Sequence, residues 1–377
     1  MTRILLSALS ARRGGGLTYL RHIIGAFPAG QGHKLSILSS APIDGLPHHP
    51  DVDWVQAPVW TARPIPRFMF GSFYFRHLWP KRQDYDLAYF AGGSFDLRLP
   101  RGVRTAVAFR NMLPFDPEAA GRYPLGWMRF RHWLLKYVQS YAFRNADLVI
   151  FISNYAQRVI DGLVKRRGVS AVIPHGVTAT TSPLDPALAE RLPERFVLYL
   201  SILDHYKAQV ELVAAWAELR RTRSTPEKLV LAGPSNRGYA DRVRAEIKRC
   251  SLEGEVILLG EVRHNQVFDL ASRATLNVFM STCENCPNIM LELMRVGRPV
   301  LVSDRQPMPE LGGTELDYVD PYDVDAVAGA LARLLDDPER RKRIATAAWT
   351  RSEMFDWADT GRRTWDAILA AASPRAL

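Results

Sequence analysis

The sequence has few cysteines and no long hydrophobic run, and both absences limit what the protein can be. Its 377 residues include only Cys250, Cys283 and Cys286, too few and too unevenly placed for the disulfide framework of a secreted domain. No stretch approaches the roughly 18 uninterrupted apolar residues that a membrane-spanning helix needs. The apolar run after Met1 is shorter than the core of a signal peptide. We therefore expect a cytoplasmic protein that does not cross a membrane.

Acidic residues are scarce in the first half of the chain. Residues 1–180 contain 23 Lys and Arg against 10 Asp and Glu, whereas the remainder contains 26 against 29. Two stretches, 60–82 and 121–145, each combine five Lys or Arg with several aromatic residues and have no acid. A basic surface of this kind attracts nucleic acid, anionic lipid or a phosphorylated substrate, and charge alone does not choose among them.

The chain alternates short apolar segments with longer amphipathic ones. Hydrophobic residues make up 47% and charged residues 23% of the sequence, as in folded globular proteins. The alternation is typical of the strand–helix–strand units of a parallel sheet. The segments expected to be strands are 3–8, 34–40, 52–57, 86–92, 104–110, 147–153 and 170–176 in the first half, and 196–202, 228–233, 256–262, 275–281 and 299–304 in the second.

A proline-containing stretch separates these two groups of strands. The segment "TATTSPLDPALAERLPER" interrupts the periodicity, so we place a domain boundary between Val177 and Pro193. We predict an α/β protein with two Rossmann-like domains whose parallel sheets face each other across a cleft, at residues 1–180 and 181–355. Ligands of such sheets bind outside the carboxyl ends of the strands, so the loops there should carry the chemistry.

Three glycines follow the first expected strand. Gly14, Gly15 and Gly16 precede an apolar helical pattern, and glycines at a helix start let backbone N–H groups approach an anion or a sugar. The spacing is not the dinucleotide-binding pattern, because the third glycine and the later acidic residue are absent. A loop for phosphate or acceptor and a tight turn without a ligand both fit.

Lys207 lies at the opening of an amphipathic segment after the strand at 196–202. An ammonium beside the free N–H groups of a helix start suits a diphosphate. The alternative is a surface lysine that extends into water, as most lysines do.

Two glutamates interrupt the apolar stretch "FMSTCENCPNIMLELMRVGRPVLVSD". Glu284 falls in the expected loop between a strand and a helix that begins at Pro287, and Glu292 lies more than one turn into that helix. A buried carboxylate without a partner is costly, so the two face either water or a ligand. We place Glu292 away from or at the border of the helix's apolar stripe. A carboxylate that accepts both hydrogen bonds of a vicinal diol is what ribose or sugar recognition requires.

Cys283 and Cys286 form a C-x-x-C pair within the same stretch. One such pair supplies two of the four ligands of a tetrahedral zinc ion, and no second pair or close histidine pair completes the set. A redox pair is expected near the first strand of a smaller fold. Neither metal nor redox chemistry is the favoured interpretation.

These motifs together resemble a known family. The segment "STCENCPNIMLELMRVGRPVLVSD" resembles the signature of the family-4 retaining glycosyltransferases of GT-B fold, in which two glutamates flank seven residues before a helix end and a Pro-Val strand. "VIPHGV" resembles the segment that links their two domains, and "FVLYLSILDHYKAQVELVAAW" and "LVLAGP" resemble the opening of the donor domain and its next strand. The likeness runs in order through residues 140–365 and is looser in the first half.

The resemblance implies roles for the residues already noted. Glu284 would lie by the hydroxyls of the donor sugar, Glu292 would hold the ribose hydroxyls, and Lys207 would bind the diphosphate. Donor contacts at the helix start would come from Asn285, Cys286, Asn288 and Ile289. The resemblance also implies transfer with retention, in which the leaving phosphate assists deprotonation of the acceptor, and it implies no metal or other cofactor.

Two departures from the family pattern affect the expected site. Ser201 and Ile202 stand where the family often has Gly-Arg, so the usual second diphosphate cation is absent from its place. Arg110 and Asn111 stand where the first domain often has a histidine. We take Arg110 and Asn111 as candidate catalytic residues, with Arg110 supplying positive charge near the sugar that is transferred.

The basic, aromatic stretches suit the headgroup boundary of an anionic membrane. In the second stretch, apolar residues recur at helical spacing and form a stripe. We expect this stripe to pack in the core and the arginines outside it to contact lipid. The members of the stripe are Trp127, Phe130, Leu134, Tyr137, Val138 and Tyr141. Stacking on single-stranded nucleic acid is the alternative.

Near the end of the chain, the pattern of residues 352–372 predicts one helix. The resemblance implies that residues 356–377 pack back on the first domain.

The sequence thus predicts a glycosyltransferase that moves a hexose-type sugar from a nucleotide diphosphate sugar to a glycan. The acceptor is expected to be lipid-linked and bound for a cell-surface polysaccharide such as O-antigen or capsule, at the cytoplasmic face of the inner membrane. The rival interpretations are a nucleotide-sugar epimerase of the same fold, a nucleic-acid-binding protein and a non-catalytic scaffold with a degenerate site.

Overall fold

The computed structural model describes residues 1–10, 15–41, 43, 49–62, 67, 70, 85–180, 182–235 and 237–373. The chain divides into two compact units. The first comprises Met1–Phe115, Phe130–Gly176 and Asp356–Leu377; the second comprises Asp116–Arg129 and Val177–Phe355. The segment Asp116–Arg129 therefore groups with the second unit, whereas we expected all of residues 1–180 to form one domain.

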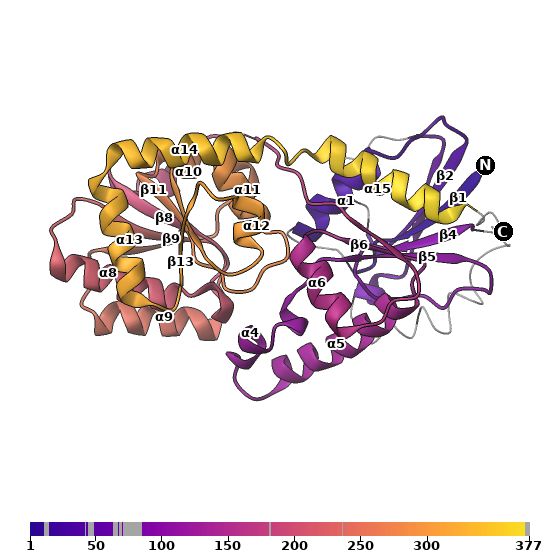
Figure 1. Ribbon diagram of the computed structural model, residues 1–377, viewed down its shortest axis with the longest axis horizontal. Coiled ribbons are helices and arrows are strands. Elements are labelled where there is room, and N and C mark those ends of the chain that lie inside the picture. The colour runs from indigo at the N-terminus through magenta and orange to yellow at the C-terminus, as the bar shows by residue number, and fades with distance from the viewer. Residues whose placement is uncertain are drawn as a thin grey trace. The chain divides into compact units, whose positions relative to one another are not determined.

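The first unit contains a seven-stranded parallel sheet (Figure 1). The strand order is β3-β2-β1-β4-β5-β6-β7, and every neighbouring pair is parallel. Each expected strand of the first half is present, with these bounds: β1 (Thr2–Ser7), β2 (His33–Ser39), β3 (Val52–Gln56), β4 (Leu87–Phe90), β5 (Arg104–Phe109), β6 (Leu148–Phe151) and β7 (Val169–Val172).

Helices cover both faces of this sheet. On one face, α1 (Gly15–Gly25) and α15 (Trp357–Ala372) pack side by side, and the indole of Trp365 donates a hydrogen bond to the Ile23 carbonyl at 2.7 Å. On the other face, α5 (Trp127–Asn145) packs through Phe143, whose ring lies 5.0 Å from that of Phe109 on β5. The remaining described helices of this unit are α6 (Asn154–Leu163) and the short η1 (Val59–Ala62) and η3 (Leu113–Phe115).

The second unit contains a six-stranded parallel sheet with the order β10-β9-β8-β11-β12-β13. Five strands were expected: β8 (Phe196–Leu200), β9 (Lys228–Ala232), β10 (Val256–Gly260), β11 (Leu276–Phe279) and β12 (Val300–Ser303). The edge strand β13 (Asp317–Val319) was not, because three residues are too few to show a pattern.

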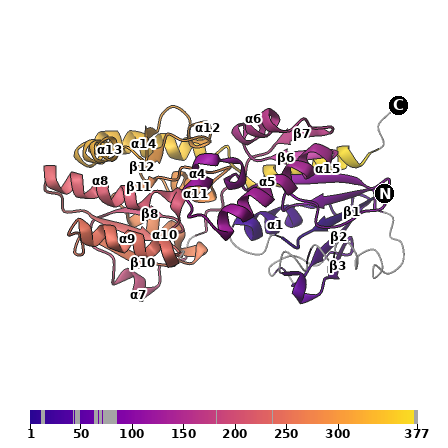
Figure 2. The same cartoon turned by 90° about the horizontal axis from the view of Figure 1, so that it is seen from below.

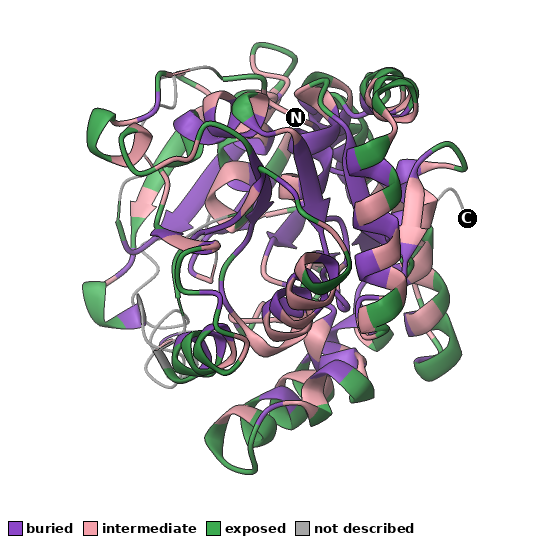
Figure 3. Cartoon of the chain, turned by 90° about the vertical axis from the view of Figure 1, so that its left-hand side faces the viewer, coloured by how far each residue is buried: buried purple, intermediate pink, exposed green. Residues whose placement is uncertain are grey.

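Most helices of the second unit follow its strands along the chain, whereas α4 and α7 precede the first of these strands. The helices are α4 (Pro117–Gly121), α7 (Pro186–Ala189), η4 (His205–Lys207), α8 (Gln209–Thr222), α9 (Arg237–Arg249), η5 (His264–Gln266), α10 (Val267–Arg273), α11 (Asn288–Arg295), α12 (Met308–Gly312), α13 (Val324–Asp336) and α14 (Pro338–Ser352). Figure 3 shows most strands buried and the helices exposed on their outer sides. Strands buried on both faces explain the continuous apolar runs of the sequence.

Two expectations about helices are wrong. The segment 352–372 is not one helix, because α14 ends at Ser352 and α15 begins at Trp357 after its N-cap Asp356. The apolar stripe of α5 does not lie in the core: all six of its expected members are exposed. The helix instead buries His132, Gln139, Ala142 and Phe143.

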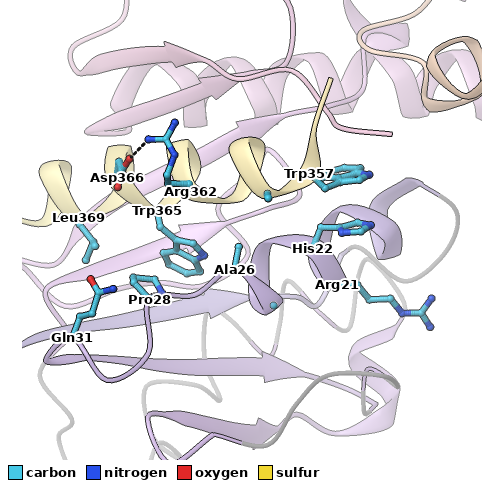
Figure 4. A pocket seen from close by; sticks show the side chains of 12 residues that line it. Arg21, His22, Ala26, Pro28, Gln31, Trp357, Arg362, Trp365, Asp366 and Leu369 are labelled. Atoms are coloured by element: carbon cyan, nitrogen blue, oxygen red, sulfur yellow. Dashed lines mark hydrogen bonds and ion pairs between the residues drawn. The ribbon is translucent and has the colours of Figure 1, made fainter. Parts of the chain in front are cut away.

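A pocket of about 580 Å³ lies between α1 and α15. Figure 4 shows the rings of His22 and Trp357 stacked at one side of it and Trp365 extending toward Pro28. Its described lining includes none of the predicted site residues. The pocket marks where α15 returns to pack on the first unit.

Candidate active site

The loops at the carboxyl ends of two central strands carry the predicted lysine and the first predicted glutamate of the second unit. Strands β8 and β11 are hydrogen-bonded neighbours in parallel register, so the loops that follow them emerge at the same edge of the sheet. The first loop contains Lys207 and the second contains Glu284. Although 77 positions separate them in the sequence, the Lys207 ammonium and the Glu284 carboxylate form an ion pair.

Lys207 is buried, with a relative exposure of 7%. Its ammonium also lies 4.8 Å from the ring centre of Tyr206 and 5.4 Å from that of Phe279. Burial alone would lower the pKa of Lys207, but the neighbouring carboxylate of Glu284 outweighs it and the pKa is raised. The alternative of a lysine extended into water is therefore wrong, and this side chain is held charged inside the site.

Backbone and hydroxyl hydrogen bonds fix the two loops to each other. The Tyr199 hydroxyl donates to the Lys207 carbonyl at 2.8 Å, and the Thr282 N–H donates to the Tyr206 carbonyl at 2.8 Å. On the acid's side, the Ser281 hydroxyl donates to the Glu284 carboxylate at 2.6 Å. The ion pair is thus positioned by the strand ends rather than by flexible side chains alone.

Glu292 is enclosed in α11, with a relative exposure of 4%. We expected it on the open side or at the border of the apolar stripe, but it is as buried as its neighbours in the helix. One carboxylate oxygen, Oε1, lies 2.9 Å from His264 Nε2. The other, Oε2, is buried and has no hydrogen-bond partner among the described residues. Buried carboxylate oxygens are nearly always satisfied, so Oε2 is an acceptor available to a ligand.

His264 was not predicted from the sequence. It opens η5, directly beyond the carboxyl end of β10. The rule that loops after strand ends carry the site would have included it, but "EVRHNQ" shows no motif of its own. Its ring fixes one carboxylate oxygen of Glu292 and so directs the other away from itself.

The start of α11 presents backbone N–H groups beside these side chains. Pro287 is the N-cap and makes no side-chain capping bond. The Leu291 N–H donates to the Pro287 carbonyl at 3.3 Å, so the hydrogen bonds of the helix begin there, and the N–H groups of its first turn have no carbonyl of the helix within reach. Asn288 and Ile289 lie in that first turn and are half-buried, whereas Asn285 and Cys286 are buried in the loop before it.

The two cysteines of the C-x-x-C pair are buried, and they do not form a disulfide. Burial, followed by the nearby charge of Asp116, raises the pKa of the Cys283 thiol well above its ordinary value. A thiol held protonated is a poor metal ligand and a poor nucleophile. No group of three or more His, Cys, Asp or Glu with metal-binding geometry occurs among the described residues.

The loop after β8 has different side chains from those of the family pattern. Ser201 is buried and Ile202 is half exposed at 40%. Gly233, at the end of β9, has a φ of +139°, and a Cβ there would lie 2.2 Å from the Ser201 carbonyl oxygen. The backbones of the two loops are therefore in direct contact, which leaves no room for a side chain at position 233.

Arg110 and Asn111 lie beyond the carboxyl end of β5 in the first unit. Arg110 Nε donates to the Ala91 carbonyl at 2.9 Å, and its guanidinium lies 4.8 Å from the ring centre of Tyr19. Burial lowers the pKa of Arg110. Asn111 is exposed, and its Oδ1 accepts a hydrogen bond from the Leu113 N–H at 3.3 Å. Their proposed part in catalysis stays a prediction.

Of the three glycines, Gly14 lies outside the described residues, whereas Gly15 and Gly16 form the first positions of α1. Asp96, at the carboxyl edge of the first unit's sheet, was not predicted from the sequence. Its carboxylate accepts hydrogen bonds from the Ser7 hydroxyl at 2.8 and 3.0 Å. Burial raises the pKa of Asp96 to about 6.

Comparison with known structures and families agrees with this architecture. Two Rossmann-like units, each with a parallel sheet, are the arrangement of the GT-B glycosyltransferases. The profile described as "Glycosyltransferase Family 4" matches residues 13–180, and the one described as "Glycosyl transferases group 1" matches residues 183–351. The chain belongs to this family and is a nucleotide-sugar-dependent glycosyltransferase.

Individual relatives are distant. The chain is 25% identical to the O-antigen chain mannosyltransferase B of Escherichia coli over 78% of each chain. Among solved structures, sucrose-phosphate synthase from Thermosynechococcus elongatus has a TM-score of 0.75 at 22% identity, covering 99% of this chain and 100% of that one. HepE of Anabaena in complex with UDP-glucose has a TM-score of 0.71 at 19% identity, covering 98% and 100%. At these identities the structures establish the fold.

Proposed function

We propose that the protein transfers a hexose-type sugar from a nucleotide diphosphate sugar to a glycan acceptor, with retention of configuration at the anomeric carbon. The observation that carries the proposal is the buried carboxylate of Glu292, with one oxygen held by His264 and the other lacking a partner. A carboxylate in this state accepts hydrogen bonds from the two hydroxyls of a ribose. The nucleoside of the donor supplies them.

The donor diphosphate is assigned to Lys207 and the start of α11. A buried ammonium attracts phosphate oxygens strongly because little water screens its charge. Only one of its three N–H donors is needed for the ion pair with Glu284. The N–H groups of the α11 first turn add hydrogen bonds and a positive helix end.

Glu284 is assigned to the transferred sugar. Its loop lies between β11 and α11, and its carboxylate is oriented by Lys207 and Ser281. In the proposed reaction the bond between the anomeric carbon and the diphosphate oxygen breaks, and the acceptor oxygen bonds to the same face. The leaving phosphate takes the acceptor's proton, so the mechanism uses no metal and no separate protein base.

The acceptor is proposed to be a lipid-linked glycan of a cell-surface polysaccharide. The O-antigen chain mannosyltransferase among the relatives supports this assignment, as does the excess of Lys and Arg in residues 1–180. No helix in the described part of the chain is long and apolar enough to span a bilayer. We place the enzyme at the cytoplasmic face of the membrane, bound through its basic surface.

The test is a donor screen followed by product analysis. Purified protein is incubated with UDP-, GDP-, ADP- and dTDP-hexoses, and a stabilising donor is identified from the shift in melting temperature. That donor is then supplied with lipid-linked acceptor, and the anomeric configuration of the product is read by NMR. A product with the donor's configuration is expected, in the presence of EDTA as well.

Several outcomes would contradict the proposal. Inverted configuration would remove the retaining mechanism, and loss of activity in EDTA would remove the metal-free one. Release of an altered free nucleotide sugar without acceptor would favour an epimerase. An unchanged donor after long incubation with many acceptors would favour a non-catalytic scaffold.

A further inference from the structure

The outer face of α5 carries an exposed set of large apolar side chains. Six of them belong to the first unit and define what we call the α5 face: Phe130, Trp133, Leu134, Tyr137, Val138 and Tyr141. Trp133 is 63% and Tyr137 is 70% exposed. At about 100° per residue, the six fall within a stripe roughly 140° wide along the helix. Figures 1 and 2 show α5 at the outside of the first unit.

The helix is amphipathic in the reverse of the usual sense. Its buried positions include the polar His132 and Gln139 together with Ala142 and Phe143, whereas its exposed positions are aromatic and aliphatic. A helix on a soluble protein ordinarily turns such a stripe toward the core. A contiguous exposed apolar patch marks an interaction surface.

Basic residues border the α5 face on both sides. Arg131 lies just beyond one edge of the stripe and Lys136 beyond the other, and Arg144 lies near its C-terminal end. Arg131 and Arg144 are exposed and Lys136 is half-buried. The helix has no acidic residue. The surface therefore combines an apolar centre with positive charge only.

We propose that the α5 face docks on the surface of an anionic lipid bilayer. Tyrosine and tryptophan have an apolar body and a polar edge and settle at the boundary between headgroups and acyl chains. Arginine and lysine at the borders of the stripe reach the phosphates of the same headgroups. The helix then lies in the plane of the interface with its apolar side inward.

Charge favours this occupant over a second copy of the chain. Two α5 faces brought together would oppose Arg131, Lys136 and Arg144 to the same cations, with no acid on either helix to compensate. An anionic bilayer offers both the apolar depth and the counter-charge that the face lacks.

The inference rests on the proposed function only in its account of why docking is useful, since a lipid-linked acceptor lies at that surface. Docking itself is measured without donor or acceptor. Failure to transfer sugar would leave a positive docking result intact, and a failure to dock would leave sugar transfer to a soluble acceptor intact.

The experiment is vesicle flotation of the full chain. Vesicles of phosphatidylcholine alone are compared with vesicles in which roughly one lipid in three is the anionic phosphatidylglycerol. We expect the wild-type protein to float with the anionic vesicles and to be released progressively as salt rises. Trp133→Ser combined with Tyr137→Ser should reduce the bound fraction at least tenfold. Trp349→Ser, at an exposed tryptophan of α14, is the matched control and should float like the wild type.

A second variant keeps the test decisive if the first is unstable. Arg131→Gln combined with Arg144→Gln leaves the apolar stripe intact and should lower binding to anionic vesicles severalfold while removing most of the salt dependence. A circular dichroism spectrum and a melting temperature like those of the wild type show that each variant is folded.

Four results would overturn the inference. The first is that the wild type stays in the bottom fraction in the presence of anionic vesicles, and the second is that both variants float as the wild type does. Loss of a dimer in the Trp133→Ser/Tyr137→Ser variant, without vesicle binding by the wild type, would assign the face to a second copy. Salt-sensitive retention of single-stranded oligonucleotide, lost in the same variant, would assign it to nucleic acid.

Discussion

The ammonium of Lys207 is paired with the carboxylate of Glu284, which comes from a loop 77 positions further along the chain. Both side chains are largely buried, with 9% and 15% of their surfaces exposed. Neutralising one member of a buried pair leaves the other charge without compensation, which is more damaging than removing both. The pair therefore contributes to stability at the same point of the fold where we propose that the donor binds.

Glu284→Gln is expected to reduce the free energy of unfolding by about 3 kcal/mol, because it leaves the Lys207 ammonium buried without a counter-charge. The Lys207→Met/Glu284→Gln double variant should lose less than the sum of the two single variants. Urea unfolding at pH 7.5 measures all three. Strictly additive losses would show that the two charges do not interact in the folded protein.

Glu292→Gln is expected to weaken donor binding about tenfold or more, since hydrogen bonds to a charged acceptor contribute about 1.5–3 kcal/mol. The informative comparison uses a 2′,3′-dideoxynucleotide diphosphate. Removing the ribose hydroxyls should weaken binding to the wild type, but it should change binding to Glu292→Gln much less.

Glu253→Gln, at an exposed glutamate of the same unit, is the matched control and should leave donor affinity unchanged. If the dideoxynucleotide penalty is equal in the wild type and in Glu292→Gln, the carboxylate does not contact the ribose.

His264→Phe is expected to raise the dissociation constant of the donor severalfold while leaving turnover at saturating donor nearly unchanged. The phenyl ring cannot hydrogen-bond to Glu292 Oε1, so the carboxylate loses the contact that orients it. His264→Gln, which keeps a donor group, should recover part of the affinity. Equal effects of the two substitutions would indicate that His264 acts through packing rather than through its hydrogen bond.

The sheets could be predicted from the sequence because their strands are buried on both faces. Segments such as "FVLYLSI" and "DLVIFIS" are continuous apolar runs, and twelve of the thirteen strands were expected from such runs. The short edge strand β13 has no comparable run. Lys207, Glu284 and Glu292 were also predictable, since they follow strand ends or interrupt apolar stretches.

The features that were predicted wrongly or not at all depend on packing between residues far apart in the sequence. The period of the α5 stripe indicates a helix with an apolar face, but a period does not say whether that face meets the core or the outside. The hydrogen bond between His264 and Glu292 joins η5 to α11 across 28 positions of the sequence. The segment Asp116–Arg129 groups with the second unit only through contacts made after folding. Local sequence patterns do not indicate such contacts.

The carboxyl group of Asp96 should make stability depend on pH. Burial raises its pKa to about 6, against about 3.9 for an unfolded aspartate. Between these values the folded state binds more protons than the unfolded state, so stability falls as pH rises from about 4 to about 6 and stays lowered above that. Asp96→Asn keeps an oxygen that can accept the Ser7 hydroxyl but carries no charge. It should therefore be more stable than the wild type by about 1 kcal/mol at pH 7.5.

The advantage of Asp96→Asn should shrink as pH falls and vanish near pH 4, because both proteins are then neutral at this position. Melting temperatures between pH 4 and pH 8 measure the trend, and Asp53→Asn, at an exposed aspartate of the same unit, serves as the control. A difference between Asp96→Asn and the wild type that is constant over this range would mean that the carboxylate at position 96 is not the group that titrates.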